Sequence, residues 1–201
     1  MRFAPTMSRV ISARNLAKRF GDKRVFDGVD VELDAGGFLL VTGPNGSGKT
    51  TLLRVLSHLA APTRGELELP PRETIGYIGH EPLVYRELTA RENLTLFARL
   101  YGIPRGSTRV GDVLAAFGLG DVADARVATF SRGMQQRLGL ARVVLPAPDV
   151  LVLDEPYNAL DAEGCALLDG LLDEFRGRTF VVATHDAARV EHRATEQLAF
   201  A

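Results

Sequence analysis

Eight consecutive residues, 43–50, have the composition and spacing of a phosphate-binding loop. Their sequence, Gly-Pro-Asn-Gly-Ser-Gly-Lys-Thr, fits the pattern G-x-x-x-x-G-K-[ST] at every fixed position. Glycines allow the backbone to bring its N–H groups close to phosphate oxygens. We therefore expect a nucleoside triphosphate, with Lys49 at its β- and γ-phosphates and the Thr50 hydroxyl on Mg²⁺. A Gly-rich surface turn is the alternative, but average glycine usage of about 7% makes a chance match rare.

Two adjacent carboxylates, Asp154 and Glu155, follow the apolar run Val150–Leu153. The run has the pattern of a buried strand, so the pair should lie at the carboxyl edge of a sheet, where open α/β sheets bind ligands. Asp154 is placed to bind Mg²⁺, which prefers oxygen ligands. Glu155 can accept a proton from a water that attacks the γ-phosphate. A solvated strand end is the alternative, and the upstream phosphate loop favours the catalytic interpretation.

A third segment, residues 130–137, reads Phe-Ser-Arg-Gly-Met-Gln-Gln-Arg. Ser131 is a favoured N-cap residue, and apolar residues follow it at helical spacing. A helix should therefore begin at residues 131–133, and a helix N-terminus favours anions. Because the phosphate loop already supplies one helix N-terminus for its own nucleotide, the ATP of a second chain is the economical target. An ordinary capped helix remains the alternative.

Short apolar strands that alternate with helical patterns should position these segments. The predicted strands are Val10–Ala13, Val29–Leu33, Phe38–Val41, Thr74–Ile78, Val150–Leu153 and Phe180–Ala183. The last four predict a parallel sheet covered on both faces, and the first two, with no helix between them, predict an antiparallel layer. A helix after the phosphate loop should present Leu52, Leu53, Val55, Leu56 and Leu59 on its buried face. From Glu92 to Val144 the spacing is helical, with breaks near 102–104 and 118–120, which indicates an inserted helical subdomain.

The composition indicates one intracellular domain. The chain has 201 residues, a formal net charge of −1 and one cysteine, Cys165. Such a length can bury a sizeable core, and so small a net charge gives no whole-chain attraction to nucleic acid, so no nucleic-acid partner is expected. One cysteine cannot form an internal disulfide, and we interpret Cys165 as a small buried helix residue. No apolar run approaches the roughly 18 residues of a membrane span, and Met1–Met7 read as a loose leader without a signal peptide's apolar centre. We therefore expect a cytosolic protein whose membrane work comes through a partner.

Taken together, the three segments resemble those of ATP-binding-cassette (ABC) ATPases, in the order that this family has, and the resemblance covers nearly the whole chain. It implies an α/β P-loop NTPase fold with a RecA-like parallel sheet core, an N-terminal antiparallel β layer and an inserted α-helical subdomain. We expect a single domain over 1–201, with the nucleotide-binding core in 8–79 and 145–201 and the helical signature subdomain in 80–144.

The resemblance also implies roles for single residues. Ser131 and Gly133 match signature residues that contact the γ-phosphate on the partner subunit, whereas Arg132 and Met134 depart from the family's Leu-Ser-Gly-Gly-Gln pattern. The expected ATP contacts in the phosphate loop and just after it are Gly43, Pro44, Asn45, Gly46, Ser47, Gly48, Lys49, Thr50 and Thr51.

Four further positions acquire roles in the same way. Phe20 matches an aromatic that stacks on adenine, with an aromatic covering the hairpin core as the alternative. Asp161 matches the acidic position of a loop that passes between the two ATP sites, and His185 matches a histidine at the γ-phosphate and attacking water. His80 stands where most members have a glutamine that touches Mg²⁺ and the attacking water. A histidine can still bind water or a metal, so we expect His80 to take part in hydrolysis.

The resemblance implies an ATP-hydrolysing transporter subunit, and the cofactors would be ATP and Mg²⁺. Two copies, or this chain and a related one, would sandwich ATP and drive export through separate integral membrane permease subunits, from a peripheral position on the inner face of the bacterial cell membrane. The segment Gly-His-Glu-Pro at 79–82, the short chain and the lack of a C-terminal extension resemble the subgroup that exports haem for cytochrome c maturation.

Three alternatives remain. The chain could serve another exporter, for a drug, a lipid or a polysaccharide. It could be a soluble, non-transport ABC protein, although these usually carry long coiled coils or two cassettes. It could also be an ATP sensor without turnover, which the presence of Lys49, Asp154, Glu155 and His185 disfavours.

Overall fold

The computed structural model describes residues 9–104 and 106–200. Within this part the chain forms two compact units. Unit 1 contains 9–77, 149–155 and 176–200, and unit 2 contains the described residues of 78–148 together with 156–175. The predicted leader, Met1–Met7, lies outside the described residues.

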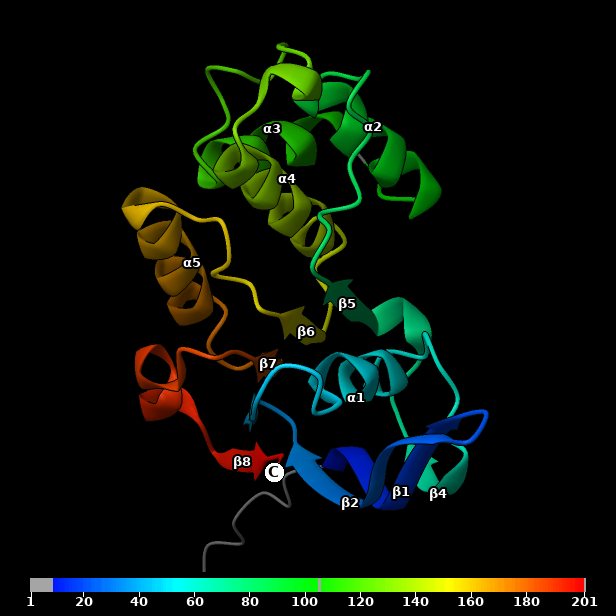
Figure 1. The fold of residues 1–201 in the computed structure, drawn as a ribbon. Helices are drawn as coiled ribbons and strands as arrows, with labels where there is room; N and C mark the ends of the chain where they lie inside the picture. The colour runs from blue at the N-terminus through cyan, green and yellow to red at the C-terminus, as the bar shows by residue number, and fades with distance from the viewer. Residues whose placement is uncertain (1–8, 105, 201) are drawn as a thin grey trace, which may run out of the picture. The chain divides into compact units, whose positions relative to one another are not determined.

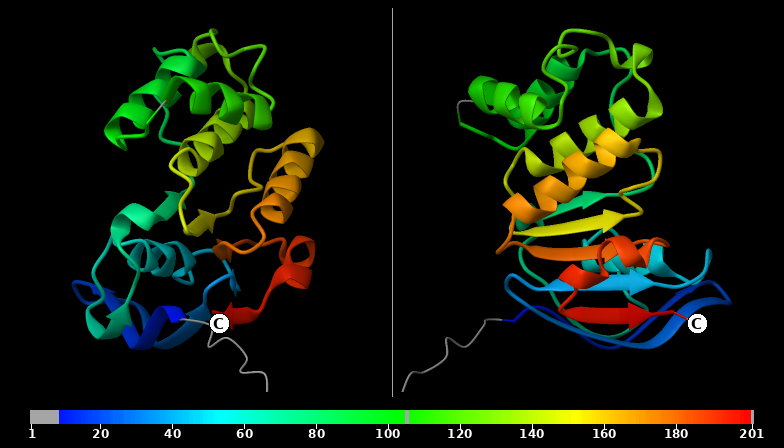
Figure 2. Two further views of the ribbon diagram at one scale, coloured as in Figure 1. Left: turned by 180° about the vertical axis from the view of Figure 1, so that it is seen from behind. Right: turned by 90° about the vertical axis from the view of Figure 1, so that its left-hand side faces the viewer.

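A mostly buried sheet of five strands forms the centre of unit 1 (Figure 1). Its order is β5 (Ile75–Ile78), β6 (Val150–Asp154), β7 (Thr179–Ala183), β3 (Phe38–Thr42) and β8 (Glu196–Ala199). From β6 to β8 the neighbouring strands pair in parallel, and Figure 2 shows their arrows pointing the same way. Every residue of β6 and β7 is buried, as expected for strands covered on both faces. The predicted α/β fold with a parallel sheet is confirmed.

Helix α1 (Lys49–Leu56) follows β3 through the phosphate loop. Its apolar residues belong to the main core cluster of unit 1: Leu52, Leu53, Val55 and Leu56. The prediction that Leu59 continues this face is wrong, because the helix ends at Leu56 and Leu59 is exposed. His58 adopts a left-handed φ of 56°, which turns the chain out of the helical register.

An antiparallel sheet covers the other side of this core, as the N-terminal strands predicted. Its order is β2 (Lys23–Asp34), β1 (Arg9–Phe20) and β4 (Arg64–Glu68). In the second half of β2 every other residue is buried, and Val29, Val31 and Leu33 join the same core cluster as α1. One apolar face per strand is the pattern that lets such a sheet pack on a core while its other face meets water.

Unit 2 is helical. Its helices are α2 (Ala90–Leu100), α3 (Gly106–Ala116), α4 (Arg132–Val144) and α5 (Ala162–Glu174). The breaks predicted near 102–104 and 118–120 fall between α2 and α3 and after α3. Thr89 and Glu92 form a capping box that fixes the start of α2. The short 3₁₀ helices of the chain are η1 (Arg72–Thr74), η2 (Val127–Thr129), η3 (Ala187–Arg189) and η4 (Glu191–Arg193).

The division into units differs from the predicted one. The sequence suggested that 8–79 and 145–201 belong to the α/β core, whereas 78–79, 145–148 and 156–175, the last with α5, group with the helical unit. Within unit 2, Arg137 Nη1 on α4 lies 3.9 Å from Glu163 Oε1 on α5. Cys165, expected to be buried on a helix, lies on α5 and is only partly buried. Among the described residues, no helix is both long enough and apolar enough to span a bilayer.

Candidate nucleotide-binding and hydrolysis site

The phosphate loop of unit 1 adopts a backbone that glycine alone adopts without strain. Gly43, Gly46 and Gly48 have φ values of 140°, 83° and 111°. A Cβ on Gly48 would also lie 3.0 Å from Val25 Cγ1, which is tighter than ordinary packing allows. The loop therefore needs its glycines both for conformation and for the close approach of its backbone to β2.

Lys49 turns back onto the loop. Its Nζ donates hydrogen bonds to the carbonyl oxygens of Gly43, at 2.7 Å, and Pro44, at 3.1 Å, and the side chain is buried. These two oxygens satisfy a charge that is otherwise costly to bury. Anionic oxygens brought to the loop would be stronger partners for the same ammonium, so the side chain is held within reach of a phosphate.

Asp154 ends β6 and is 2% exposed, and neither of its carboxylate oxygens has a hydrogen-bond partner among the residues that the structure describes. Burial raises its pKa, and Glu155 adds to the rise, whereas the Thr50 hydroxyl, Arg54 and Lys49 oppose it. The Ser47 hydroxyl of the phosphate loop is also buried, with no hydrogen-bond partner within 9–104 and 106–200. Buried oxygens of this kind fit a hard cation, and Asp154 with the Thr50 and Ser47 hydroxyls are the residues that could hold Mg²⁺.

The described residues contain no group of three or more His, Cys, Asp or Glu side chains that could hold a metal by themselves. This is compatible with Mg²⁺, which is usually bound by one or two carboxylates together with phosphate oxygens and water.

Glu155 and His185, which the sequence assigned to catalysis, are brought together in unit 1. Glu155 Oε2 lies 2.8 Å from His185 Nδ1 and accepts a hydrogen bond from the His185 backbone N–H at 3.2 Å. Glu155 has a left-handed φ of 50°, which is strained for a residue other than glycine, and its N–H donates to Ala183 O. The carboxylate is thus aimed by both its backbone and its neighbour, while the imidazole, 65% exposed, keeps Nε2 available for another partner.

The predicted adenine-stacking residue, Phe20, is 58% exposed at the end of β1. The alternative, in which it covers the hairpin core, therefore does not hold. Lys18 Nζ lies 4.8 Å from the centre of the ring and leaves much of the ring surface free. An exposed aromatic face can stack on a flat heterocycle.

The remaining predicted site residues lie in unit 2. Ser131 caps α4, since its Oγ accepts from Met134 N at 3.2 Å, and the first turn of α4 has no acidic residue. A Cβ on Gly133 would lie 3.2 Å from Ala159 O, so the glycine allows the 156–161 loop to approach the start of α4. Asp161 caps α5 through a 2.8 Å bond from Gly164 N, and His80 is exposed.

Two residues beside Asp154 were missed by the sequence reasoning. Arg54 lies on α1 one helical turn after Thr50, and its charge favours the ionised form of Asp154. Burial raises the pKa of Tyr77 on β5, and the charge of Asp154 raises it further. The only local signal for Arg54 was its position four residues after Thr50, which places both on one side of a helix. That Tyr77 lies near Asp154 follows only from the order of the strands, in which β5 is next to β6.

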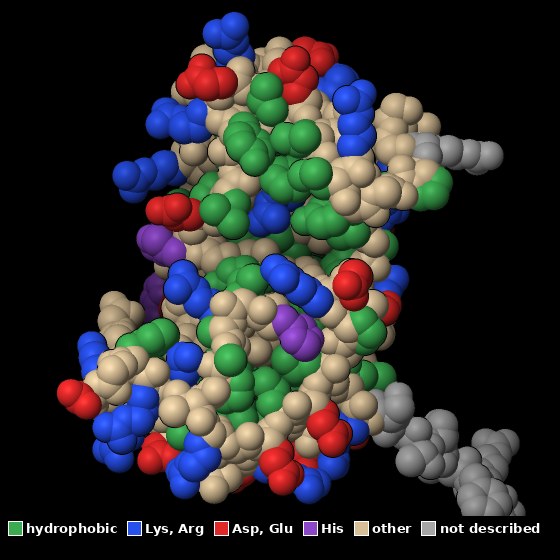
Figure 3. Space-filling view, turned by 90° about the vertical axis from the view of Figure 1, so that its right-hand side faces the viewer, with side chains coloured by type: hydrophobic (Ala, Val, Ile, Leu, Met, Phe, Trp, Pro, Cys, Tyr) green, Lys and Arg blue, Asp and Glu red, His purple; other side chains and the backbone are tan. Residues whose placement is uncertain are grey.

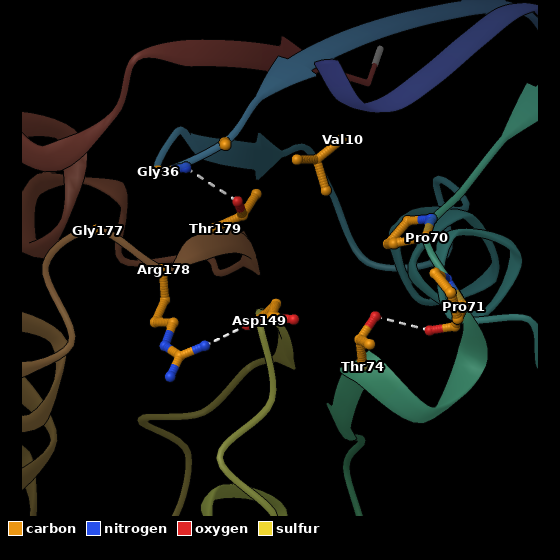
Figure 4. A pocket seen from close by; sticks show the side chains of 10 residues that line it. Val10, Gly36, Pro70, Pro71, Thr74, Asp149, Gly177, Arg178 and Thr179 are labelled. Carbon is orange, nitrogen blue, oxygen red and sulfur yellow. Dashed lines mark hydrogen bonds and ion pairs between the residues drawn. The ribbon is translucent and has the colours of Figure 1, made fainter. Parts of the chain in front are cut away.

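Unit 1 also has a cavity of about 420 Å³, whose lining residues are drawn in Figure 4 and include none of the predicted site residues. Its lining residues are Val10, Ala35, Gly36, Pro70, Pro71, Thr74, Asp149, Gly177, Arg178 and Thr179. Asp149 directly precedes β6, and Thr179 is the first residue of β7, so the cavity lies at the amino ends of these strands. Asp149 forms an ion pair with Arg178 there. Because ligands bind open α/β sheets at the carboxyl ends, this cavity is not the nucleotide site.

Residues 26–158 match the family model described as "ABC transporter". The chain belongs to the ABC transporter family. It is an ABC ATPase, a transporter subunit that binds ATP and couples its hydrolysis to transport, which confirms the family and activity predicted from the sequence.

Relatives of this ABC ATPase include proteins of cytochrome c biogenesis and of lantibiotic transport. It is 39% identical over 188 residues to the cytochrome c biogenesis ATP-binding export protein CcmA of Cupriavidus necator, covering 88% of this chain and 83% of the relative. It is 32% identical over 194 residues to the lantibiotic transport ATP-binding protein SrtF of Streptococcus pyogenes, covering 92% and 84%. A solved dimer of an ATP-binding cassette, in a post-hydrolysis state with ADP and Pi, matches with a TM-score of 0.82 and 26% identity over 95% of this chain and 94% of the other.

Proposed function

We propose that this ABC ATPase drives a bacterial exporter that serves cytochrome c biogenesis, with haem as the cargo of the complete transporter. The observation that carries the proposal is its identity of 39%, over 88% of the chain, to the CcmA protein of Cupriavidus necator. The chain supplies the energy, and the membrane subunits select the cargo.

ATP binds at the phosphate loop of unit 1. Its phosphates replace the carbonyl oxygens of Gly43 and Pro44 as partners of Lys49 Nζ, which the short distances to those carbonyls support. The exposed ring of Phe20 stacks on the adenine. Thr50 and Asp154 would hold Mg²⁺, and the ion would supply positive charge to neutralise the phosphates. The unpartnered oxygens of Asp154 support this role.

Hydrolysis uses Glu155 as the acceptor of a proton from the attacking water. His185 orients this carboxylate through the 2.8 Å contact at Nδ1 and presents Nε2 to the γ-phosphate. His80 acts beside the same water in place of the glutamine that most family members have. Its exposure leaves its ring nitrogens free to do so.

Residues of a second subunit complete each ATP-binding site. Ser131 and Gly133 at the start of α4 contact the γ-phosphate bound by the partner, and the 156–161 loop, whose last residue Asp161 caps α5, passes between the two sites. The dimer of the related cassette with ADP and Pi supports this arrangement. The dimer works at the inner face of the cell membrane with permease subunits, which membership of the ABC transporter family supports.

The test is affinity isolation of the tagged chain from detergent-solubilised membranes, followed by identification of the integral membrane protein that co-purifies. We expect a haem-handling membrane complex. A drug, lipid or polysaccharide permease would contradict the cargo, and recovery of soluble complexes alone would contradict the membrane partner.

A second cargo class has support of its own. The 32% identity to SrtF, over 92% of this chain, favours an exporter of a peptide as the runner-up. The same isolation distinguishes the two, because the co-purifying permease would then be one that handles peptides.

A further inference from the structure

The exposed ring of Phe20 has a cation over one of its faces. Lys18, on the same strand, places its Nζ 4.8 Å from the centre of the ring. The same ammonium donates a hydrogen bond of 2.7 Å to the carbonyl oxygen of Ala61, in the segment between α1 and β4. A lysine side chain in water samples many rotamers, whereas this one has two partners that hold it beside the ring.

The strand that carries the ring is anchored independently of the Lys18 side chain. Arg19 N donates a hydrogen bond to Thr63 Oγ1 at 3.1 Å, and Thr63 N donates to Ala17 O at 2.8 Å. These two bonds tie the end of β1 to the segment that precedes β4. They remain when the Lys18 side chain is changed, so the backbone at Phe20 keeps its place. The side chain of Lys18 therefore acts on the orientation of the ring rather than on the path of the strand.

The contact has two consequences for the ring of Phe20. The face of an aromatic ring is negative, so a cation over it is attracted and resists rotation of the ring away from it. The covered face is closed to a second flat group, while the ring as a whole remains 58% exposed. A ring that is oriented before its ligand arrives loses less side-chain entropy when the ligand binds.

We propose that Lys18 is a positioning residue for the nucleobase: its ammonium, tied to Ala61 O, covers one face of Phe20, orients the ring and directs adenine to the opposite face. The proposal rests on the proposed function, in which Phe20 stacks on adenine. In this role Lys18 strengthens nucleotide binding through the ring and takes no part in hydrolysis.

A general attraction between basic residues and phosphates is the competing explanation. Lys18 is one of four basic residues around the turn that joins β1 and β2, with Arg19, Lys23 and Arg24, and Figure 3 shows Lys and Arg side chains gathered on the surface of unit 1. Such a cluster attracts phosphates whatever the nucleobase, and salt weakens the attraction. Within 9–104 and 106–200, only the charge of Lys18 among these four lies over the ring of Phe20.

The test is calorimetric titration of the full-length chain with Mg-ADP in 0.15 M salt, which measures binding without hydrolysis. We expect Lys18→Met to raise the Kd about 2–5-fold, the size of a cation–π contact at an exposed site. Lys18→Arg keeps a cation that can lie over the ring, so it should restore the parent affinity. Phe20→Ala removes the stacking surface and should raise the Kd at least about fivefold.

The double variant Lys18→Met/Phe20→Ala separates the two explanations. Because Lys18 acts through the ring, the double variant should bind Mg-ADP as tightly as Phe20→Ala does. If Lys18→Met weakens binding by the same factor with and without the ring, the charge acts on the phosphates and the proposal is wrong.

Two single variants serve as controls. Lys23→Met removes the same charge from the residue that pairs with Phe20 across β1 and β2, and Thr63→Val removes the acceptor of the Arg19 N–H. Both should bind Mg-ADP as the parent does. An equal loss of affinity in either control would assign the effect of Lys18 to distant charge or to the anchoring of the strand, and would overturn the proposal.

Turnover supplies a readout that a merely structural role of Lys18 would not give. Lys18→Met should raise KM for Mg-ATP by the same factor as the Kd and keep kcat, with an unchanged melting temperature as the check on folding. A fall in kcat at unchanged affinity would contradict the positioning role. If Phe20→Ala binds Mg-ADP as the parent does, the adenine stacking in the proposed function fails. If Phe20→Ala weakens binding but Lys18→Met does not, the role of Lys18 is wrong while the proposed function stands.

Discussion

Replacing Glu155 with Gln tests the proposed proton acceptor most directly. The amide keeps the shape of the side chain and can still accept from the His185 backbone N–H, but it cannot take up a proton at neutral pH. Loss of a positioned general base slows the chemical step by roughly 10²- to 10⁴-fold, which corresponds to about 2.7 to 5.4 kcal/mol of transition-state stabilisation. ATP affinity should change little, because Lys49 and the phosphate loop are untouched.

The structure limits how far the same substitution can affect stability. The Glu155–His185 contact involves an imidazole that is 65% exposed, and such exposed pairs contribute at most about 1 kcal/mol. The left-handed backbone of residue 155 is equally strained with Gln. We expect a change in melting temperature of no more than about 2–4 °C in a chain of this length.

The assay combines the steady-state ATPase rate with size-exclusion chromatography in saturating Mg-ATP. The variant should accumulate as a dimer near twice the 21.8 kDa of one chain, because bound ATP is no longer consumed. Glu191→Gln, a neutral replacement of an exposed carboxylate elsewhere in unit 1, serves as the control. A Glu155→Gln protein that stays monomeric and hydrolyses ATP at the parent rate would refute both the assignment of the base and the ATP-bound pairing.

Three further substitutions test other parts of the site. Burial raises the pKa of the folded Asp154 carboxyl above its unfolded value of 3.8, so the folded state loses stability as pH rises from the unfolded to the folded pKa. Asp154→Asn should therefore raise the melting temperature at pH 7 without Mg-ATP, by about 2–4 °C for each kcal/mol of stability gained. The same substitution should abolish Mg²⁺-dependent hydrolysis. No rise between pH 4 and pH 7, relative to the parent, would contradict the buried charge. Ser131→Arg should reduce hydrolysis by at least about tenfold and leave the nucleotide affinity of the monomer unchanged, as measured by titration with a fluorescent ATP analogue. His80→Gln should retain ATP binding and substantial hydrolysis, and complete loss of turnover would show that the imidazole has a role that glutamine cannot fill.

The parts of the fold that the sequence predicted are those with contiguous signals. The apolar runs of β3, β6 and β7 and the phosphate loop are short, local patterns, and each lies where its pattern indicated. β4 and β8 were missed because they are edge strands with mostly exposed side chains, so no apolar run marks them. In β4, Gly65 reads as a turn residue, yet a Cβ there would lie 2.6 Å from Asn15 O, and the glycine is needed for close pairing with β1.

The candidate site was predictable in its motifs and not in its supporting contacts. Asp154, Glu155 and His185 were identified as strand-end residues, but the 2.8 Å contact between Glu155 and His185 depends on how β6 and β7 pair. The same holds for Arg142 on α4, whose position in an apolar helical repeat gave no sign that its guanidinium would be buried. Sequence patterns specify which face of an element is buried, whereas the pairing of side chains from distant elements requires the fold.

The hydrogen bonds of Ser131 explain why serine is suited to the N-cap of α4. Its Oγ already accepts a hydrogen bond from Met134 N, so its role as a cap uses the oxygen as acceptor and leaves the O–H free to donate. With no acidic residue in the first turn, the exposed start of α4 carries donors and a partial positive charge without an anion of its own. An alanine would lose both functions, and an aspartate would keep the cap but repel a phosphate. Serine is therefore suited to cap the helix and to contact the γ-phosphate of a second subunit at the same time, and Ser131→Asp should preserve folding while preventing that contact.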